Sequence, residues 1–137
     1  MYMAQRFCVS VIVTALVLAG LSCSRRSGSQ EQTTVCFAFQ DLETEFWVAG
    51  HKAITETLRK KGIQVIERNA NEDANRQLEQ VRAAIARGVD GIIIIPQDGE
   101  SAVTIVGEAN KAGVPIAVFN RPPANKSNPA LVIVADN

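Results

Sequence analysis

The sequence contains few aromatic residues and few of the side chains on which most catalytic sites depend. Only 5% of its 137 residues are aromatic, and it has one tryptophan, one tyrosine and one histidine. That histidine, His51, has no serine or cysteine near it in the sequence, so it forms no recognisable triad and is interpreted as an ordinary helix residue. His, Cys, Asp and Glu never occur with the spacing of a metal site. The sequence therefore favours a protein that is not an enzyme and has no cofactor or metal.

Phosphate-binding motifs are also missing. There is no GxGxxG and no GxxxxGK[ST], and residues 40–45 contain no glycine. Nucleotide and flavin sites of the usual kind are therefore disfavoured. The 14 Lys and Arg residues balance 14 Asp and Glu residues, and no dense basic stripe occurs. The sequence thus predicts no nucleic-acid partner.

The amino-terminal segment is typical of an exported protein. Arg6 precedes an apolar run at residues 7–21. This run is short for a membrane-spanning helix, which needs roughly 20 residues, and it fits the apolar region of a secretory signal better. We predict a signal peptide at residues 1–22 and a polar, flexible tether at residues 23–33. A retained membrane anchor is the alternative.

The end of the apolar run, Gly20-Leu21-Ser22-Cys23, resembles the lipobox of bacterial lipoproteins. The resemblance implies that Cys23 becomes the lipidated first residue of the mature protein and anchors it to a membrane, since several acyl chains hold a protein firmly. Cleavage near Ser22 without lipidation is the alternative. With Cys8 removed and Cys23 lipidated, Cys36 has no disulfide partner and is expected to be a small buried side chain.

From residue 34 onward, apolar strands alternate with amphipathic helices. Apolar runs predict strands at residues 35–39, 63–67, 91–96, 114–119 and 131–135. The helices between them are expected to begin at the caps Thr44, Asn71 or Asp73, and Ser101, and to end at Gly62, Gly88 and Gly113. The first helix is expected to face the sheet with Ala53, Ile54, Thr57 and Leu58.

This alternation with short connections predicts right-handed crossovers and an α/β fold, an open, doubly wound parallel sheet. If the strand order is 2-1-3-4-5, ligands bind beyond the carboxyl ends of the first and third strands, where the order reverses. The candidate segments are then residues 40–47, 96–100, 120–121 and 136–137.

Aromatic rings and polar planar groups occur together in these segments. Phe46 and Trp47 lie at the start of the first helix, and Asn120 and Arg121 follow the fourth strand. A sugar has apolar C–H faces that suit aromatic rings, and a hydroxyl rim that suits amide and guanidinium groups. The alternatives are that the aromatic pair only packs the helix onto the sheet, that Arg121 is a solvated loop residue, and that Gln97 or Asp98 merely caps the third helix.

Four stretches of the sequence resemble the ribose-binding-like periplasmic sugar-binding proteins of ABC importers: VCFAFQDLETEFWVAGHKAITETLRKKG, GVDGIIIIPQD, AGVPIAVFNRP and VADN. The resemblance implies two lobes that close on a monosaccharide, and a membrane permease that recognises the closed protein. It implies ligand contacts at Gln40, Thr44, Phe46, Trp47, Asn120 and Arg121. The family often has Asn-Pro where this chain has Thr44-Glu45, which leaves the identity of the sugar open.

The resemblance also identifies residues 34–137 as an incomplete amino-terminal lobe, since family members are roughly twice as long and carry a second lobe of ordinary domain size. We interpret the sequence as a fragment or a truncated reading frame, and we expect the isolated chain to bind sugar weakly or not at all. Two other functions remain open, a ligand sensor that feeds a membrane kinase and the effector domain of a lactose-repressor-like regulator. The regulator would need a helix-turn-helix where this chain has an export signal.

Overall fold

The computed structural model describes residues 32–125 and 127–134. The predicted signal peptide at residues 1–22, the predicted lipidation site Cys23 and most of the predicted tether lie outside the described residues. Within the described part of the chain, no helix combines the length and the apolar character that crossing a membrane requires.

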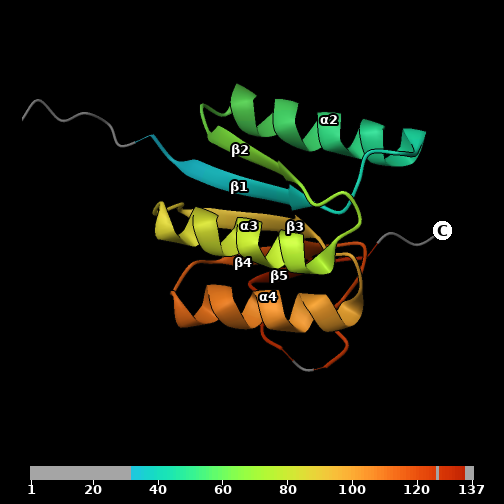
Figure 1. Ribbon diagram of the computed structural model, residues 1–137. Coiled ribbons are helices and arrows are strands. Elements are labelled where there is room, and N and C mark those ends of the chain that lie inside the picture. The colour runs from blue at the N-terminus through green and yellow to red at the C-terminus, as the bar shows by residue number, and fades with distance from the viewer. Residues whose placement is uncertain (1–31, 126, 135–137) are drawn as a thin grey trace, which may run out of the picture. The chain divides into compact units, whose positions relative to one another are not determined.

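Strands and helices alternate as the sequence predicts (Figure 1). The strands are β1 (Thr34–Phe39), β2 (Gln64–Asn69), β3 (Gly91–Ile95), β4 (Ile116–Phe119) and β5 (Leu131–Ile133). The helices are α2 (Glu45–Lys60), α3 (Ala74–Ala86) and α4 (Gly99–Lys111). Each helix is followed by a glycine with positive φ, at Gly62, Gly88 and Gly113, because glycine takes the left-handed conformation without the steric cost of a Cβ atom.

The five strands form one parallel sheet in the order β2-β1-β3-β4-β5. This confirms the predicted doubly wound parallel sheet, and the strand order is the one on which the candidate segments were conditional. The chain goes from β1 to β2 on one side and then crosses to β3 on the other, so the order reverses between β1 and β3. All strands end at the same edge of the sheet (Figure 1), which we call the carboxyl edge. The loops of this edge follow residues 39, 69, 95 and 119.

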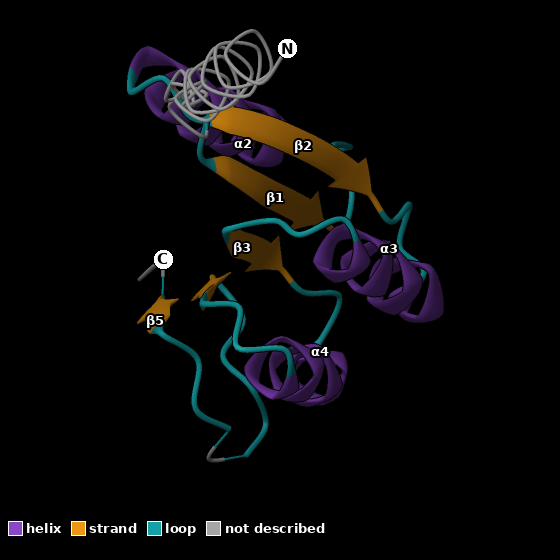
Figure 2. Ribbon diagram, turned by 90° about the vertical axis from the view of Figure 1, so that its left-hand side faces the viewer, coloured by secondary structure: helices purple, strands orange, loops and turns teal. Residues whose placement is uncertain are grey.

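Helices α3 and α4 cover one face of the sheet (Figure 2). Their buried side chains and those of the strands beneath them form the larger of the two apolar clusters. Ile94 of β3 and Ile105 of α4 belong to this cluster, and both are fully buried. Cys36 belongs to this cluster, and burial raises the pKa of its thiol to about 11. Cys36 is therefore a small buried side chain, as the sequence predicts, and has little thiolate character.

Helix α2 covers the other face, where a smaller cluster consists of Phe37, Phe39, Trp47 and Ile95. The side chains that α2 turns inward are those of Trp47, His51, Ile54, Thr55 and Leu58, and the His51 ring packs against Phe37 and Phe39. The predictions that Ala53 and Thr57 face the sheet were wrong, because both are exposed. The large Trp47 ring sets the rotation of the helix, and the spacing of 3.6 residues per turn then places residues 54, 55 and 58 on the same side.

Of the predicted helix caps, the one for α4 was wrong. Thr44 caps α2 by accepting a hydrogen bond from the Trp47 N–H, and Asp73 caps α3. Ser101 does not cap α4 as predicted, because the helix begins at Gly99 and Asp98 is its cap. Ser101 completes a capping box instead, in which its N–H donates to Asp98 Oδ1 at 2.7 Å and its hydroxyl accepts from the Asp98 N–H. A carboxylate at this position satisfies helix N–H groups that would otherwise have no partner.

Candidate functional site

Arg121 is the central cationic side chain of the carboxyl edge. Its Nη1 donates hydrogen bonds to Gln40 Oε1, to the carbonyl oxygen of Pro96 at 3.1 Å and to that of Gln97 at 2.6 Å. Gln40 follows β1, and Pro96 and Gln97 follow β3. The guanidinium thus reaches from the end of β4 to the ends of β1 and β3, the point where the strand order reverses. Of the six predicted ligand contacts, Gln40 and Arg121 are brought into direct contact.

The remaining guanidinium nitrogens of Arg121, Nε and Nη2, have no recorded hydrogen-bond acceptor among the described residues. The side chain is neither fully buried nor fully exposed. A guanidinium carries five N–H donors in a rigid plane. One end of that plane is held by the protein, and the other is available to a ligand that offers hydroxyl or carbonyl oxygens.

Asn120 turns the chain so that Arg121 can point back over the sheet. Its φ is 72°, a left-handed value, and the N–H of Arg121 donates to the carbonyl oxygen of Phe119 across it at 3.0 Å. This is a γ-turn, which is strained when its central residue has positive φ, and asparagine tolerates such values better than most residues. The Asn120 N–H donates to the Ile133 carbonyl oxygen at 2.7 Å, so β5 helps to hold the turn.

The loop that carries Arg121 is also attached to the start of α4. The Ala124 N–H donates to the Gly99 carbonyl oxygen at 2.9 Å. A Cβ atom on Gly99 would lie 3.1 Å from the Pro122 carbonyl oxygen and 3.2 Å from Ala124 N. Only glycine allows the two backbones to approach so closely without a shift.

Asp98 adds negative charge near Arg121. The Ser101 N–H, which binds its carboxylate, keeps the pKa of Asp98 below its ordinary value, and the positive charge of Arg121 contributes in the same direction. Asp98 is therefore ionised at neutral pH. It caps α4, as the alternative interpretation held, and it also offsets part of the charge of Arg121.

The predicted aromatic contacts lie at the first turn of α2. Phe46 is 51% exposed, whereas Trp47 is only 9% exposed and packs with Phe37, Phe39 and Ile95. The two rings meet edge to face, with centroids 4.9 Å apart. Trp47 thus fixes the first turn of α2 on the sheet and supports Phe46, which faces solvent.

Trp47 and Arg121 both lie around the end of β3. The Trp47 ring packs in a cluster with Ile95, the last residue of β3, and Arg121 binds the carbonyl of the next residue, Pro96. No direct contact between Arg121 and either aromatic ring is recorded among the described residues. Thr44 is exposed and its hydroxyl accepts from the Trp47 N–H at 3.4 Å.

Two buried polar residues near Arg121 were not singled out by sequence reasoning. Asp41 is 6% exposed and accepts from Gln40 Nε2 at 2.7 Å and from the Glu43 N–H at 3.0 Å. Gln77 of α3 is 0% exposed, and its Nε2 donates to the Ile95 carbonyl oxygen while its Oε1 accepts from the Gln97 N–H. Its helical position, four residues before the inward-facing Val81, was the available sequence signal for its burial.

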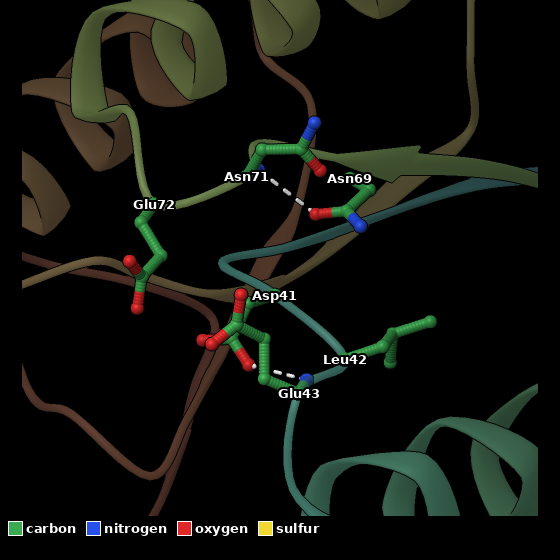
Figure 3. A pocket seen from close by; sticks show the side chains of 6 residues that line it. All are labelled: Asp41, Leu42, Glu43, Asn69, Asn71 and Glu72. Atoms are coloured by element: carbon green, nitrogen blue, oxygen red, sulfur yellow. Dashed lines mark hydrogen bonds between the residues drawn. The ribbon is translucent and has the colours of Figure 1, made fainter.

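A hollow beside this site lies between the loops that follow β1 and β2 (Figure 3). Its lining residues are Asp41, Leu42, Glu43, Asn69, Asn71 and Glu72. Asn71 and Glu72 both have positive φ, and the Glu72 N–H donates to the Gln40 carbonyl oxygen at 2.9 Å. The candidate segments named from the sequence include the loop after β1 but omit the loop after β2, because residues 69–72 contain no aromatic or basic side chain.

Comparison with known proteins gives consistent matches. Residues 35–137 match the family model described as periplasmic binding protein domain. The ribose import binding protein RbsB of Bacillus subtilis is 30% identical over 94% of this chain and 45% of its own length. The D-xylose-binding periplasmic protein of Escherichia coli is 26% identical over 80% of this chain and 32% of its own length. The chain therefore spans less than half the length of these relatives.

Solved structures agree on the fold. An ABC transporter solute binding protein from Bacillus halodurans with bound myo-inositol is 34% identical, with a TM-score of 0.64 over 71% of this chain and 34% of that protein. The myo-inositol binding protein of Caulobacter, at 23% identity, has a TM-score of 0.70 over 76% of this chain and 35% of that protein.

Proposed function

Because the chain belongs to the periplasmic binding protein domain family, we propose that it is the sugar-binding component of an ABC importer and that residues 34–137 form one lobe of its binding domain. The observation that carries this proposal is the position of Arg121 at the carboxyl edge, with one end of its guanidinium held by the protein and the other open. The names of relatives that bind ribose, xylose and myo-inositol support a neutral polyhydroxylated ligand.

In this proposal the protein binds its ligand and makes or breaks no covalent bond. Arg121 donates to the hydroxyl rim of the sugar, Asn120 both donates to it and accepts from it, and Phe46 offers an apolar ring to its C–H face. Trp47 and Thr44 hold the first turn of α2, from which Phe46 projects. A second lobe closes over the sugar and completes the site, and binding shifts the population toward the closed state, which the permease distinguishes from the open state.

Nuclear magnetic resonance titration of the full chain tests the ligand class, because it detects binding that is too weak for calorimetry. We expect a panel of pentoses, hexoses and myo-inositol to shift the resonances of Phe46, Asn120 and Arg121. Arg121→Lys keeps the charge but loses the planar fork, and should weaken binding on the order of tenfold, since a hydrogen bond to a charged group contributes about 1.5–3 kcal/mol.

Arg82→Lys is the matched control, since Arg82 lies in α3 and pairs with Glu79 and Glu108. It should leave the sugar titration unchanged. Shifts that cluster away from the carboxyl edge, or equal binding by Arg121→Lys and the wild type, would contradict the proposed function.

We further propose that the protein is exported and that Cys23 carries a lipid that holds it on a membrane. The lipobox-like residues 20–23 support this. Expression in a bacterium with a labelled fatty acid should label the wild-type chain and the Cys8→Ala variant, but not Cys23→Ala. Labelling that survives in Cys23→Ala would exclude Cys23 as the lipidated residue without bearing on sugar binding.

A further inference from the structure

Arg121 is held by a small set of buried groups that we call the Arg121 bracket: Gln40, Asp41, Gln77 and the carbonyl groups of Pro96 and Gln97. We propose that Gln40 is a positioning residue. Its side-chain amide links the buried carboxylate of Asp41 to the guanidinium of Arg121 by hydrogen bonds, and it does not contact the sugar itself. This inference rests on the proposed function only in taking Arg121 as a sugar contact. It replaces the expectation that Gln40 is a ligand contact.

The hydrogen bonds of Gln40 give both polar atoms of its side-chain amide a protein partner, and its burial keeps the second N–H and the second lone pair from a ligand. Its Nε2 donates to Asp41 Oδ2 at 2.7 Å, and its Oε1 accepts from Arg121 Nη1. A carboxylate can only accept and a guanidinium can only donate, so the amide has one possible orientation between them. Gln40 is 5% exposed and Asp41 is 6% exposed. Water therefore competes little for these bonds, and buried hydrogen bonds to charged groups are stronger than exposed ones.

Asp41 is fixed at its other oxygen. Its Oδ1 accepts from the Glu43 N–H at 3.0 Å, in the loop after β1. Both carboxylate oxygens thus face donors, and the sequence of bonds from the Glu43 N–H through Asp41 and Gln40 to Arg121 has only one consistent arrangement of donors and acceptors. An ionised carboxylate at the inner end strengthens each step because neighbouring hydrogen bonds polarise one another.

Gln77 supports the bracket from the opposite side of the sheet. Its Nε2 donates to the Ile95 carbonyl oxygen at 2.9 Å, and its Oε1 accepts from the Gln97 N–H at 3.3 Å. These two bonds span Pro96 and fix the backbone whose carbonyl oxygens accept from Arg121. Gln77 is fully buried in α3. Gln40 therefore holds the guanidinium directly, and Gln77 holds the loop whose carbonyl groups bind it. Holding the guanidinium before the ligand arrives reduces the entropy lost on binding.

The rotation of the Arg121 guanidinium tests this proposal without any ligand. In the full wild-type chain we expect slow rotation and separate Nη1 and Nη2 nitrogen resonances. Gln40→Leu removes the acceptor at similar volume and should speed the rotation about tenfold, because a hydrogen bond to a charged group is worth more than 1.4 kcal/mol. Gln80→Leu is the control, since Gln80 donates to the Asn69 carbonyl oxygen and has no recorded bond to Arg121.

Exchanging the amide of residue 40 with the carboxylate of residue 41 distinguishes an effect of hydrogen bonding on Arg121 from an effect of packing. Gln40→Glu places two carboxylates side by side but offers Arg121 a charged acceptor, so it is not expected to speed the rotation. Asp41→Asn replaces one of the two acceptor oxygens by an NH₂ group, which then faces either Gln40 Nε2 or the Glu43 N–H, so this single variant should speed the rotation. In the double variant, the amide of residue 41 donates to the carboxylate of residue 40, which still accepts from Arg121. Slow rotation should then return. The double variant also covers the case in which Gln40→Leu does not fold.

Unchanged rotation in a folded Gln40→Leu variant would overturn the proposal, as would a folded double variant that does not restore slow rotation. Sugar-induced shifts at the Gln40 side-chain amide that exceed those at Arg121 would also overturn it. If Arg121 behaves as expected in every variant but sugars shift resonances only away from the carboxyl edge, the proposed function fails and the bracket remains supported.

Discussion

The two faces of the sheet differ in how completely they are covered. Helices α3 and α4 close one face over a cluster of fully buried aliphatic side chains. On the other face, α2 lies over β1 and β2 (Figure 2). The edge strand β5 is exposed along its whole length. Leu131 is 52% exposed and Ile133 is 44% exposed. Stability is thus expected to come mainly from the α3 and α4 face, whereas the α2 face contributes the aromatic side chain of the candidate site.

The contrast matters because the candidate site uses both faces. Phe46 projects from the thinly covered α2 face, whereas the bracket around Arg121 is supported by Gln77 from the closed face. A well-packed face can hold a buried polar group in one position because the surrounding side chains do not move. The three predictions below test this division, beginning with the largest expected effect.

Ile93 and Ile94 are adjacent residues of β3 that point to opposite faces. Ile94 is fully buried under α3 and α4, whereas Ile93 is partly buried on the α2 face. We expect Ile94→Ala to lower the free energy of unfolding by about 4 kcal/mol, and Ile93→Ala by about 1 kcal/mol, since cavity cost rises with burial. Chemical denaturation of the two variants measures the difference. Equal losses would show that the two faces contribute alike.

Trp47 and Phe46 make the same comparison within the α2 face. Trp47→Ala should cost about 3 kcal/mol of unfolding free energy, because the ring is nearly buried among Phe37, Phe39 and Ile95, whereas Phe46→Ala should cost less than about 1 kcal/mol. Phe46→Ala should nevertheless weaken the sugar titration. Thermal or chemical unfolding and the titration together separate the two roles, and an unchanged titration in Phe46→Ala would remove Phe46 from the site.

Asp98 and Thr44 cap helices on opposite faces, and we expect the smallest effects there. Asp98→Ala should cost about 1 kcal/mol at neutral pH and Thr44→Ala about half as much, because the bond that Thr44 accepts, at 3.4 Å, is long. The folded protein holds the pKa of Asp98 below its ordinary value of 3.8. The charged cap is therefore fully stabilising above that value, and its contribution is lost as the pH falls through the lowered pKa.

Unfolding experiments between neutral pH and about pH 2 check this dependence. The difference in stability between the wild type and Asp98→Ala should narrow at acid pH. The difference between Asp98→Asn and Asp98→Ala should stay constant, because an asparagine caps the helix without titrating. A difference between the wild type and Asp98→Ala that stays constant down to the lowest pH would contradict the assignment of Asp98 as a charged cap.

Much of the fold could be predicted from the sequence because its signals are local. Apolar runs such as residues 91–95 and the glycine stops after each helix indicate the element order directly, and short connections between strands and helices allow few parallel topologies. The inward face of α2 was harder to predict. Ala53 and Thr57 are small, and only the packing of Trp47 against Phe37 and Phe39 decides which side of the helix turns to the sheet.

The candidate site could be predicted less completely. The sequence indicated the carboxyl edge and Arg121, but the hydrogen-bond partners of Gln40 depend on residues 81 positions apart in the chain. Gln77 gave no chemical signal, since a glutamine in an amphipathic helix is usually exposed. The left-handed turn at Asn120 likewise depends on its bond to Ile133 of the neighbouring strand.

The amino-acid sequence by itself determined the α/β alternation, the parallel sheet and the edge at which ligands are expected, because these follow from the period of apolar residues and from the lengths of the connections. Only the tertiary structure decided which aromatic ring faces solvent, which face of the sheet is closed and how Arg121 is held. Those outcomes require donors and acceptors from distant segments to meet in a space from which water is largely excluded.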